Sequence, residues 1–292
     1  MTDPFIIAGG IASAPLVLDA AKRLLGPSLD MLGDGIKSGL VNRKSNVHKV
    51  AERADAKADT SQPGAIPPRV ASEVFDKAQW AEDEFVAEYL SGMLASARTL
   101  AGIDDSAVSW TALVGRLSSD QLRLHYALYS AVRGKVVGQK VENLSDWESK
   151  PVFVGYMDLI TKVLAWDGDT FQARVIEAGV GLEREGLIDT LAHGSTGFWE
   201  KHWSPRSGKA LPDDQFGFLM FQPTSAGAML FLRAHGHKLD AGKLTDVDLT
   251  LEFAGDPNQA PLPVPGYWAD DLPVLQQPSP VHEQEDPPPA KG

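Results

Sequence analysis

The sequence predicts a mainly α-helical protein with a small β-hairpin, in which a helical domain is followed by a winged-helix-like domain. Apolar residues in the central part recur at spacings of three and four, as in helices with one buried side. Further along, one apolar helix pattern is followed by two short strand patterns and a second helix. With 292 residues and 43% apolar content, the chain can bury one large core or two small ones.

Residues 1–60 are predicted to form Gly-rich amphipathic helices and a polar linker, which covers residues 55–65. One interpretation is a helix that docks on the core or on a second copy of the chain, which would give a homo-oligomer. The other is a membrane-interface or oligomerisation segment at residues 5–40, although charged residues interrupt any stretch long enough to span a bilayer. In this second interpretation the contacts come from four basic residues: Lys37, Arg43, Lys44 and Lys49.

Residues 61–134 are predicted to form the helical core domain. A pair of prolines suits the turn before its first helix. From 85 to 100, apolar residues recur at three and four, which predicts a helix buried along a wide stripe and ending at Gly102. Ser118 followed by Gln121 is a capping-box pattern and predicts the start of the next helix.

Residues 135–255 are predicted to form the winged-helix-like domain. An apolar helix over 171–182 ends at a glycine and leads into a first strand, and a second strand spans 216–222. Thr224 is a good N-cap for a closing helix over 226–234. Helix, hairpin and closing helix together give the winged-helix-like arrangement.

The segment between the two strands, His193–Asp214, combines aromatic with basic residues, as a wing that contacts a phosphate backbone or a partner does. The preceding helix, however, carries Arg174 and Arg184 among three glutamates. The sign of the charge therefore favours protein contact over nucleic-acid contact. The candidate contact residues of the wing are Trp199, Lys201, Trp203, Arg206 and Lys209.

Residues 256–292 are predicted to be a Pro-rich tail, because half of the chain's 20 prolines lie there. One interpretation is a solubilising tail. In the other, Tyr267 and Trp268 anchor it on the body of the protein or on a partner. Just before the tail, alternating apolar residues predict one more short strand at Asp248–Phe253.

Composition narrows the functional classes. The net charge of −12 argues against broad attraction to nucleic acid. Without cysteine there is no thiolate nucleophile, disulfide or Cys-ligated metal, which fits a reducing cytoplasm. Asp3 stands where a signal peptide would carry Lys or Arg. We therefore expect a cytoplasmic protein, with membrane association as the alternative.

Known catalytic motifs are not found in the sequence, so we expect neither an enzyme nor a bound cofactor. His235 and His237 could hold a metal together with His193 or His202, but paired histidines at a helix end more often cap carbonyls. The carboxylates of Glu82–Glu84 are expected on a solvated face or as charges near a helix N-terminus.

The central segments carry a recognisable pattern. Glu82 and Asp83 precede the helix at Tyr89–Ala97, and a second helix follows at Trp110–Leu124. This pattern resembles the core of the Abi-alpha family, bacterial proteins associated with abortive phage infection. The chain departs from it at Tyr89, where the family usually has Trp.

The resemblance continues over Ile66–Pro68, Leu182–Asp189 and Phe221–Gly236, and thus covers roughly residues 60 to 240. It implies a role in phage defence and no particular reaction. The predicted function is therefore antiphage defence by binding a protein or membrane target. The alternatives are a DNA-binding regulator that uses residues 171–236 and a membrane-active effector that uses residues 5–40.

Overall fold

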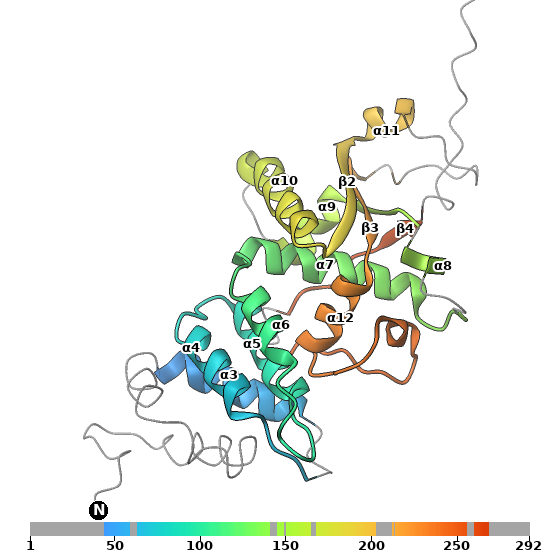
Figure 1. Cartoon of the computed structure of the whole chain (residues 1–292). Coiled ribbons are helices and arrows are strands. Elements are labelled where there is room, and N and C mark those ends of the chain that lie inside the picture. The colour runs from blue at the N-terminus through green and yellow to red at the C-terminus, as the bar shows by residue number, and fades with distance from the viewer. Residues whose placement is uncertain are drawn as a thin grey trace, which may run out of the picture.

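Helices make up most of the described chain, and a small antiparallel sheet lies beside them (Figure 1). This computed structural model describes residues 44–58, 63–140, 145–148, 150–164, 168–202, 212, 214–255 and 260–268, so the segment at 5–40 lies outside it. Within these ranges no helix has the length and apolar character needed to cross a membrane. The helical elements are α3 (Lys44–Lys57), α4 (Pro68–Ala78), α5 (Glu84–Ser96), α6 (Ala107–Val114), α7 (Ser119–Val136), α8 (Ser145–Glu148), α9 (Tyr156–Leu159), the π-helical η2 (Ile160–Leu164), α10 (Gly168–Arg184), α11 (Thr196–His202), α12 (Ser225–Ala234) and the 3₁₀ turn η3 (Ala241–Thr245).

The helix at the centre of the N-terminal half is α5. It is buried from Ala87 through Ser96, because α3, α4, α6, α7 and α12 all pack against it. Its small residues permit this close packing: a Cβ added at Gly92 would lie 2.1 Å from the carbonyl oxygen of Ala234 on α12. A helix that is enclosed on every side has no solvated face, so any charge on it needs a partner inside the protein.

The long helix α7 joins the helical half to the sheet. In Figure 1 it crosses the middle of the molecule between the strands and α12, and it contacts both. Its capping box is confirmed, since Ser118 and Gln121 exchange the two expected hydrogen bonds. The hydroxyl of Tyr129 donates to the carbonyl of Leu187 at 2.6 Å and accepts from the backbone N–H of Thr224 at 2.9 Å, so α7 also holds the open end of the hairpin, just before β2 and just after β3.

Four antiparallel strands form the sheet in the order β2-β3-β1-β4. Side chains alternate between its two faces. Val154 and Leu219 join the main core, whereas their neighbours Phe153 and Phe218 pack on the opposite face with Trp199 of α11. The strands are β1 (Val152–Gly155), β2 (Ile188–Ser195), β3 (Gly217–Pro223) and β4 (Gly266–Trp268).

The predicted hairpin is confirmed as β2 and β3, and the predicted helix after Thr224 as α12. Two further strands come from segments not predicted as strands. β1 is a short buried run, and β4 lies in the predicted Pro-rich tail, where Tyr267 and Trp268 pair with β1. The prediction that these two aromatics anchor the tail on the body of the protein is therefore confirmed.

The strand predicted at Asp248–Phe253 is wrong. The segment is irregular. The ring of Phe253 packs on the helices, 5.4 Å from the ring of Phe85 and 5.9 Å from that of Tyr126. Its alternating pattern therefore reflects packing on helices and not pairing in a sheet.

Two predicted boundaries also differ from the structure. α3 continues to Lys57, into the expected linker, and α5 ends at Ser96, before the expected end at Gly102. One hydrophobic cluster extends across the predicted division at residue 134, since it includes both Val47 and Trp268.

Replacing Gly92 with Ala is expected to destabilise the fold by about 1–3 kcal/mol, since the new methyl group would collide with backbone atoms of α12. Gly134→Ala on α7 is the matched control: nothing lies within 4 Å of its Cβ position, and the exchange should stabilise the helix by up to about 1 kcal/mol. Urea unfolding of both variants checks this, and equal stabilities would contradict the close α5–α12 packing.

Candidate functional site

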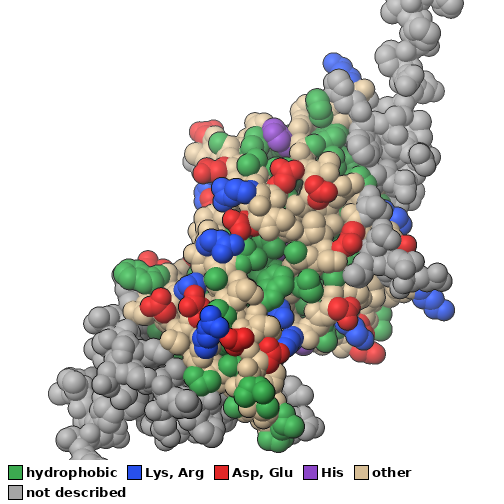
Figure 2. Space-filling view, in the orientation of Figure 1, with side chains coloured by type: hydrophobic (Ala, Val, Ile, Leu, Met, Phe, Trp, Pro, Cys, Tyr) green, Lys and Arg blue, Asp and Glu red, His purple; other side chains and the backbone are tan. Residues whose placement is uncertain are grey.

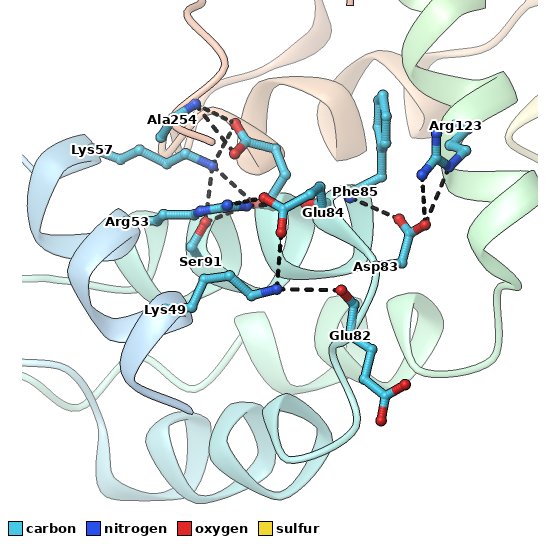
Figure 3. Close-up of polar contacts among 11 residues, drawn as sticks. Lys49, Arg53, Lys57, Glu82, Asp83, Glu84, Phe85, Ser91, Arg123 and Ala254 are labelled. Carbon is cyan, nitrogen blue, oxygen red and sulfur yellow. Dashed lines mark hydrogen bonds and ion pairs between the residues drawn. The ribbon is translucent and has the colours of Figure 1, made fainter. Parts of the chain in front are cut away.

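Three basic residues of α3 face two glutamates of α5 (Figure 3). Lys49, Arg53 and Lys57 are spaced four apart along α3, and Glu84 and Glu88 have the same spacing along α5. Residues four apart lie on the same side of a helix, so the two rows meet where the helices pack side by side. These five residues are called the α3–α5 ion-pair row below.

Glu84 is the centre of the outer part of the row. Lys49 Nζ lies 3.0 Å from Glu84 Oε1 and 3.3 Å from the carbonyl oxygen of Glu82. Arg53 donates to Glu84 Oε2 and, at 3.1 Å, to its carbonyl oxygen. Burial raises the pKa of Glu84, but hydrogen bonds from Arg53 and Lys49 outweigh this effect, so the pKa lies below its ordinary value. Glu84 is therefore an ionised carboxylate that binds two cations.

Lys57 and Glu88 form the inner part of the row, where the two side chains are only 4% and 0% exposed. Lys57 Nζ lies 2.8 Å from Glu88 Oε1 and also donates to Ser91 Oγ at 3.0 Å and to the carbonyl oxygen of Ala234 at 2.6 Å. The Glu88 carboxylate accepts the backbone N–H of Ala254 at 3.1 Å. Burial lowers the pKa of Lys57 to about 8, against the opposing attraction of Glu88. This buried pair thus connects α3, α5, the end of α12 and the segment after η3.

Asp83, just before α5, fixes the helix start to α7. Its Oδ1 accepts the backbone N–H of Phe85 at 2.8 Å, which is the N-cap bond. Its Oδ2 accepts two hydrogen bonds from Arg123, at 2.7 and 3.2 Å. The guanidinium of Arg123 also lies over the ring of Phe85, 4.8 Å from its centroid. One carboxylate therefore sets both the first turn of α5 and its contact with α7.

Two histidines lie next to this row in the core. The Tyr89 hydroxyl is 2.5 Å from Nδ1 of His125, whose Nε2 is 3.2 Å from the carbonyl oxygen of Gly227. His235 Nδ1 is 2.8 Å from the carbonyl oxygen of Phe231. Burial lowers the pKa of each imidazole to about 3. Both rings are therefore neutral at physiological pH, with Nε2 of His125 and Nδ1 of His235 donating to the carbonyls.

One of the four predicted membrane or oligomer contact residues, Lys49, belongs to the α3–α5 ion-pair row. Lys49 is bound to Glu84 and Glu82, so its ammonium group is directed toward α5 and not toward a membrane. Lys44 is the first residue of α3, and its side chain is not described. Lys37 and Arg43 lie outside the described residues.

The predicted wing residues are divided in a similar way. Trp199 is only 4% exposed, and its ring packs 5.0 Å from that of Phe153, so it belongs to the fold instead of forming a partner contact. Lys201 is exposed on α11. Trp203, Arg206 and Lys209 lie outside the described residues.

The expectation that Glu82–Glu84 form a solvated face is wrong for two of the three. Asp83 and Glu84 are bound to Arg123, Lys49 and Arg53 (Figure 3). The helix N-terminal role is confirmed for Asp83, by its N-cap bond, and for Glu84, which lies in the first turn of α5.

Sequence reasoning did not single out Arg53, Lys57 or Glu88. A signal existed: basic residues at 49, 53 and 57 keep a spacing of four, and Glu84 and Glu88 keep the same spacing in a helix that is otherwise uncharged. What the sequence does not give is that these two helices are neighbours.

The alternative of a histidine metal site gains no support. His235 caps a carbonyl of its own helix, as paired histidines at a helix end commonly do, and Nε2 of His237 lies 3.1 Å from the carbonyl oxygen of Thr250. In the part of the chain that the structure describes, no three His, Asp or Glu side chains are grouped as metal ligands would be.

Glu88→Ala would leave the ammonium group of Lys57 in the core without its carboxylate. We expect a loss of about 3–5 kcal/mol in unfolding free energy, because an uncompensated buried charge is expensive. Lys57→Met combined with Glu88→Met should cost less than the sum of the two single changes. Glu73→Ala, which breaks a partly exposed pair with Lys77, is the control and should cost under about 1 kcal/mol. If Glu88→Ala lowered the unfolding free energy as little as the control does, the buried pair would not contribute to stability.

The two core histidines predict acid sensitivity. Their folded pKa of about 3 lies below the unfolded value of about 6.5, so the unfolded chain binds more protons between these limits. Stability contributed by the neutral rings is full above pH 6.5 and falls as pH drops toward 3. The unfolding free energy is measured with urea between pH 6.5 and 5. In His125→Gln its dependence on pH should correspond to up to one fewer proton taken up on unfolding than in the parent chain. An unchanged slope would contradict this assignment.

Comparisons with known proteins do not supply a relative. No protein-family model matches the chain, and neither a curated protein nor a solved structure matches it. The resemblance to the Abi-alpha family therefore rests on the sequence pattern alone.

Proposed function

We propose that this chain is an antiphage defence protein of the abortive-infection type, which acts by binding a protein target. The resemblance to Abi-alpha proteins motivates this proposal. The five matching segments fall at the start of α4, on α5, on α6 with α7, on the end of α10 with the start of β2, and on β3 with α12. These elements pack against one another, so the residues that carry the resemblance belong to one continuous core.

The C-terminal half suits a binding module. Its elements follow the order α7, α8, β1, α9, η2, α10, β2, α11, β3, and β1 lies next to β3, so that the hairpin is extended by the earlier strand. With α8, η2 and α11 set aside, this order resembles that of a winged helix, and in the proposal α10 takes the place of the recognition helix. Winged helices bind either nucleic acid or proteins, so the chemistry of α10 decides between them.

The outward side of α10 is the observation that carries the choice of a protein target. Glu177 and Glu183 are exposed there, as is Val180, which is 50% exposed. Arg174, one of the two arginines of this helix, is bound to Asp120 of α7 by two hydrogen bonds at 2.6 and 2.9 Å. Arg184 lies 3.7 Å from the carboxylate of Glu185. Such a surface repels phosphate and presents an apolar group to a protein.

The DNA-binding regulator is the second candidate, and only the element order favours it. It requires Arg174, Arg184, Arg206 and Lys209 to form one basic surface. Arg174 is engaged with α7, and the last two lie outside the described residues. The membrane-active effector depends on residues 5–40, which also lie outside them.

The test is phage plating efficiency, with host survival at high multiplicity of infection, on cells that express the chain. We expect protection against at least one phage of a diverse panel. Val180→Asp should reduce protection about tenfold or more, since a charge would enter the contact surface. Val247→Asp, at another exposed valine, should not. The proposal would be overturned if the parent chain gave no protection against any phage. If both variants lost protection equally, α10 would not be the contact surface.

A further inference from the structure

We propose that the surface formed by α10 and the edge strand β2 is an acceptor for a basic amphipathic helix of a partner protein. This inference rests on the proposed function, since it names the chemistry of the target that the protein would bind. The surface, called the α10–β2 surface below, consists of Ile176, Glu177, Val180, Glu183, Asp189 and Leu191.

An apolar strip forms the middle of the α10–β2 surface. Ile176 and Val180 are four residues apart and therefore lie on one side of the helix. Leu191 of β2 packs against the helix beside them, because its side chain lies 2.9 Å from the position a Cβ would take at Gly179. All three apolar side chains remain partly or half exposed. Leu191 also packs against the main hydrophobic core, whereas Val180 is half exposed and is the most accessible apolar side chain of the strip.

Carboxylates border this strip. Glu177, Glu183 and Asp189 are all exposed, and Glu183 is held in place because its Oε1 accepts the backbone N–H of Leu191 at 3.1 Å. Two arginines, Arg184 and Arg116, lie near this border, and the carboxylate of Glu185 is next to both, 3.7 Å from Arg184 and 2.8 Å from Arg116. Figure 2 shows acidic, basic and hydrophobic side chains close together over the α10 end of the molecule. An apolar strip bordered by negative charge complements a partner with an apolar strip bordered by lysine or arginine.

The shape of β2 favours a helix over an added strand. A regular edge strand could accept an extended peptide by backbone pairing. In β2 the register shifts between Asp189 and Ala192, and Thr190 has a φ of 49°. The N–H of Leu191 is also used by Glu183. The bulge in β2 and the Leu191 N–H already bound to Glu183 interrupt the backbone groups with which an added strand would pair. A partner can therefore dock only through side-chain contacts on α10.

Charge also disfavours the other occupants. A second copy would set one acidic border against another, and the whole chain carries a net charge of −12. Nucleic acid and anionic lipid would be repelled for the same reason. A basic segment is attracted by both the local and the total charge.

The probe for the experiment is a fluorescein-labelled peptide of about 14 residues, or four helical turns, with leucines on one side and lysines on the other. A matched peptide carries glutamate in place of lysine. Binding to the full chain is followed by fluorescence anisotropy, and methyl and amide NMR shifts in the parent chain show where the peptide lies. We expect the lysine peptide to bind and to shift Ile176, Val180 and Leu191, and the glutamate peptide not to bind.

Glu177→Lys and Val180→Asp should each weaken binding of the lysine peptide about tenfold. Two matched controls, Glu252→Lys and Val247→Asp, repeat the same chemical changes at exposed positions elsewhere and should leave binding unchanged. Equal weakening by Glu252→Lys would show non-specific attraction to an acidic protein and would overturn the inference. Binding unaffected by Glu177→Lys and Val180→Asp would also overturn it, as would equal binding of the glutamate peptide.

Peptide binding and phage plating separate this inference from the proposed function. Specific peptide binding without phage protection would leave the surface established and the antiphage role refuted. Phage protection with no specific peptide binding would retain the antiphage role and refute the basic-helix partner.

Discussion

The burial of Glu88 is the constraint on which the rest of the structure depends. α5 is enclosed on all sides, so an ionised carboxylate on it must be compensated within the protein. The compensation comes from Lys57 of α3 and from the backbone N–H of Ala254, more than 160 residues further along the chain. Lys57 in turn donates to the carbonyl of Ala234 at the end of α12. One buried charge thus fixes the relative positions of four segments that are distant in sequence.

This constraint also separates the part of the molecule that is committed to the fold from the part that is available for contact. The carboxylates near the start of α5 are bound to α3 and α7, and the aromatic residues around them are buried. α10 differs, because it buries Phe171, Val175 and Leu182 but presents acidic and apolar side chains on its outward side. A function based on binding is therefore better placed on α10 and β2 than on the ion-pair row.

Local signals in the sequence predicted much of the fold. The cap residues Ser118 and Thr224 act on backbone groups within three residues, so a pattern of a few letters is enough to find them. The hairpin strands were found from their own apolar runs. β1 was missed because four buried residues do not distinguish a strand from other apolar segments, and β4 because its pairing partner is more than 100 residues away.

The candidate site depended on the same kind of non-local information. Lys49 was predicted to be a surface contact, because the sequence does not show that α3 lies beside α5. Trp199 was predicted to be one as well, because the sequence does not show that α11 packs over the sheet. Phe253 alternates with polar residues as a strand residue would, yet it packs on two helices. Each of these errors concerns which elements are neighbours, and none concerns the local conformation of a helix.

The central claim is that the buried pair holds α3 on α5 as part of one cooperative unit. Native-state hydrogen exchange measures this directly, because amides that open only on global unfolding share one protection level. The account predicts that the α3 amides from Val47 to Ala54 are protected to the same level as those of α5, and that Glu88→Gln lowers protection in α3 first. Exchange in α3 that is orders of magnitude faster than in α5 in the parent chain would contradict it.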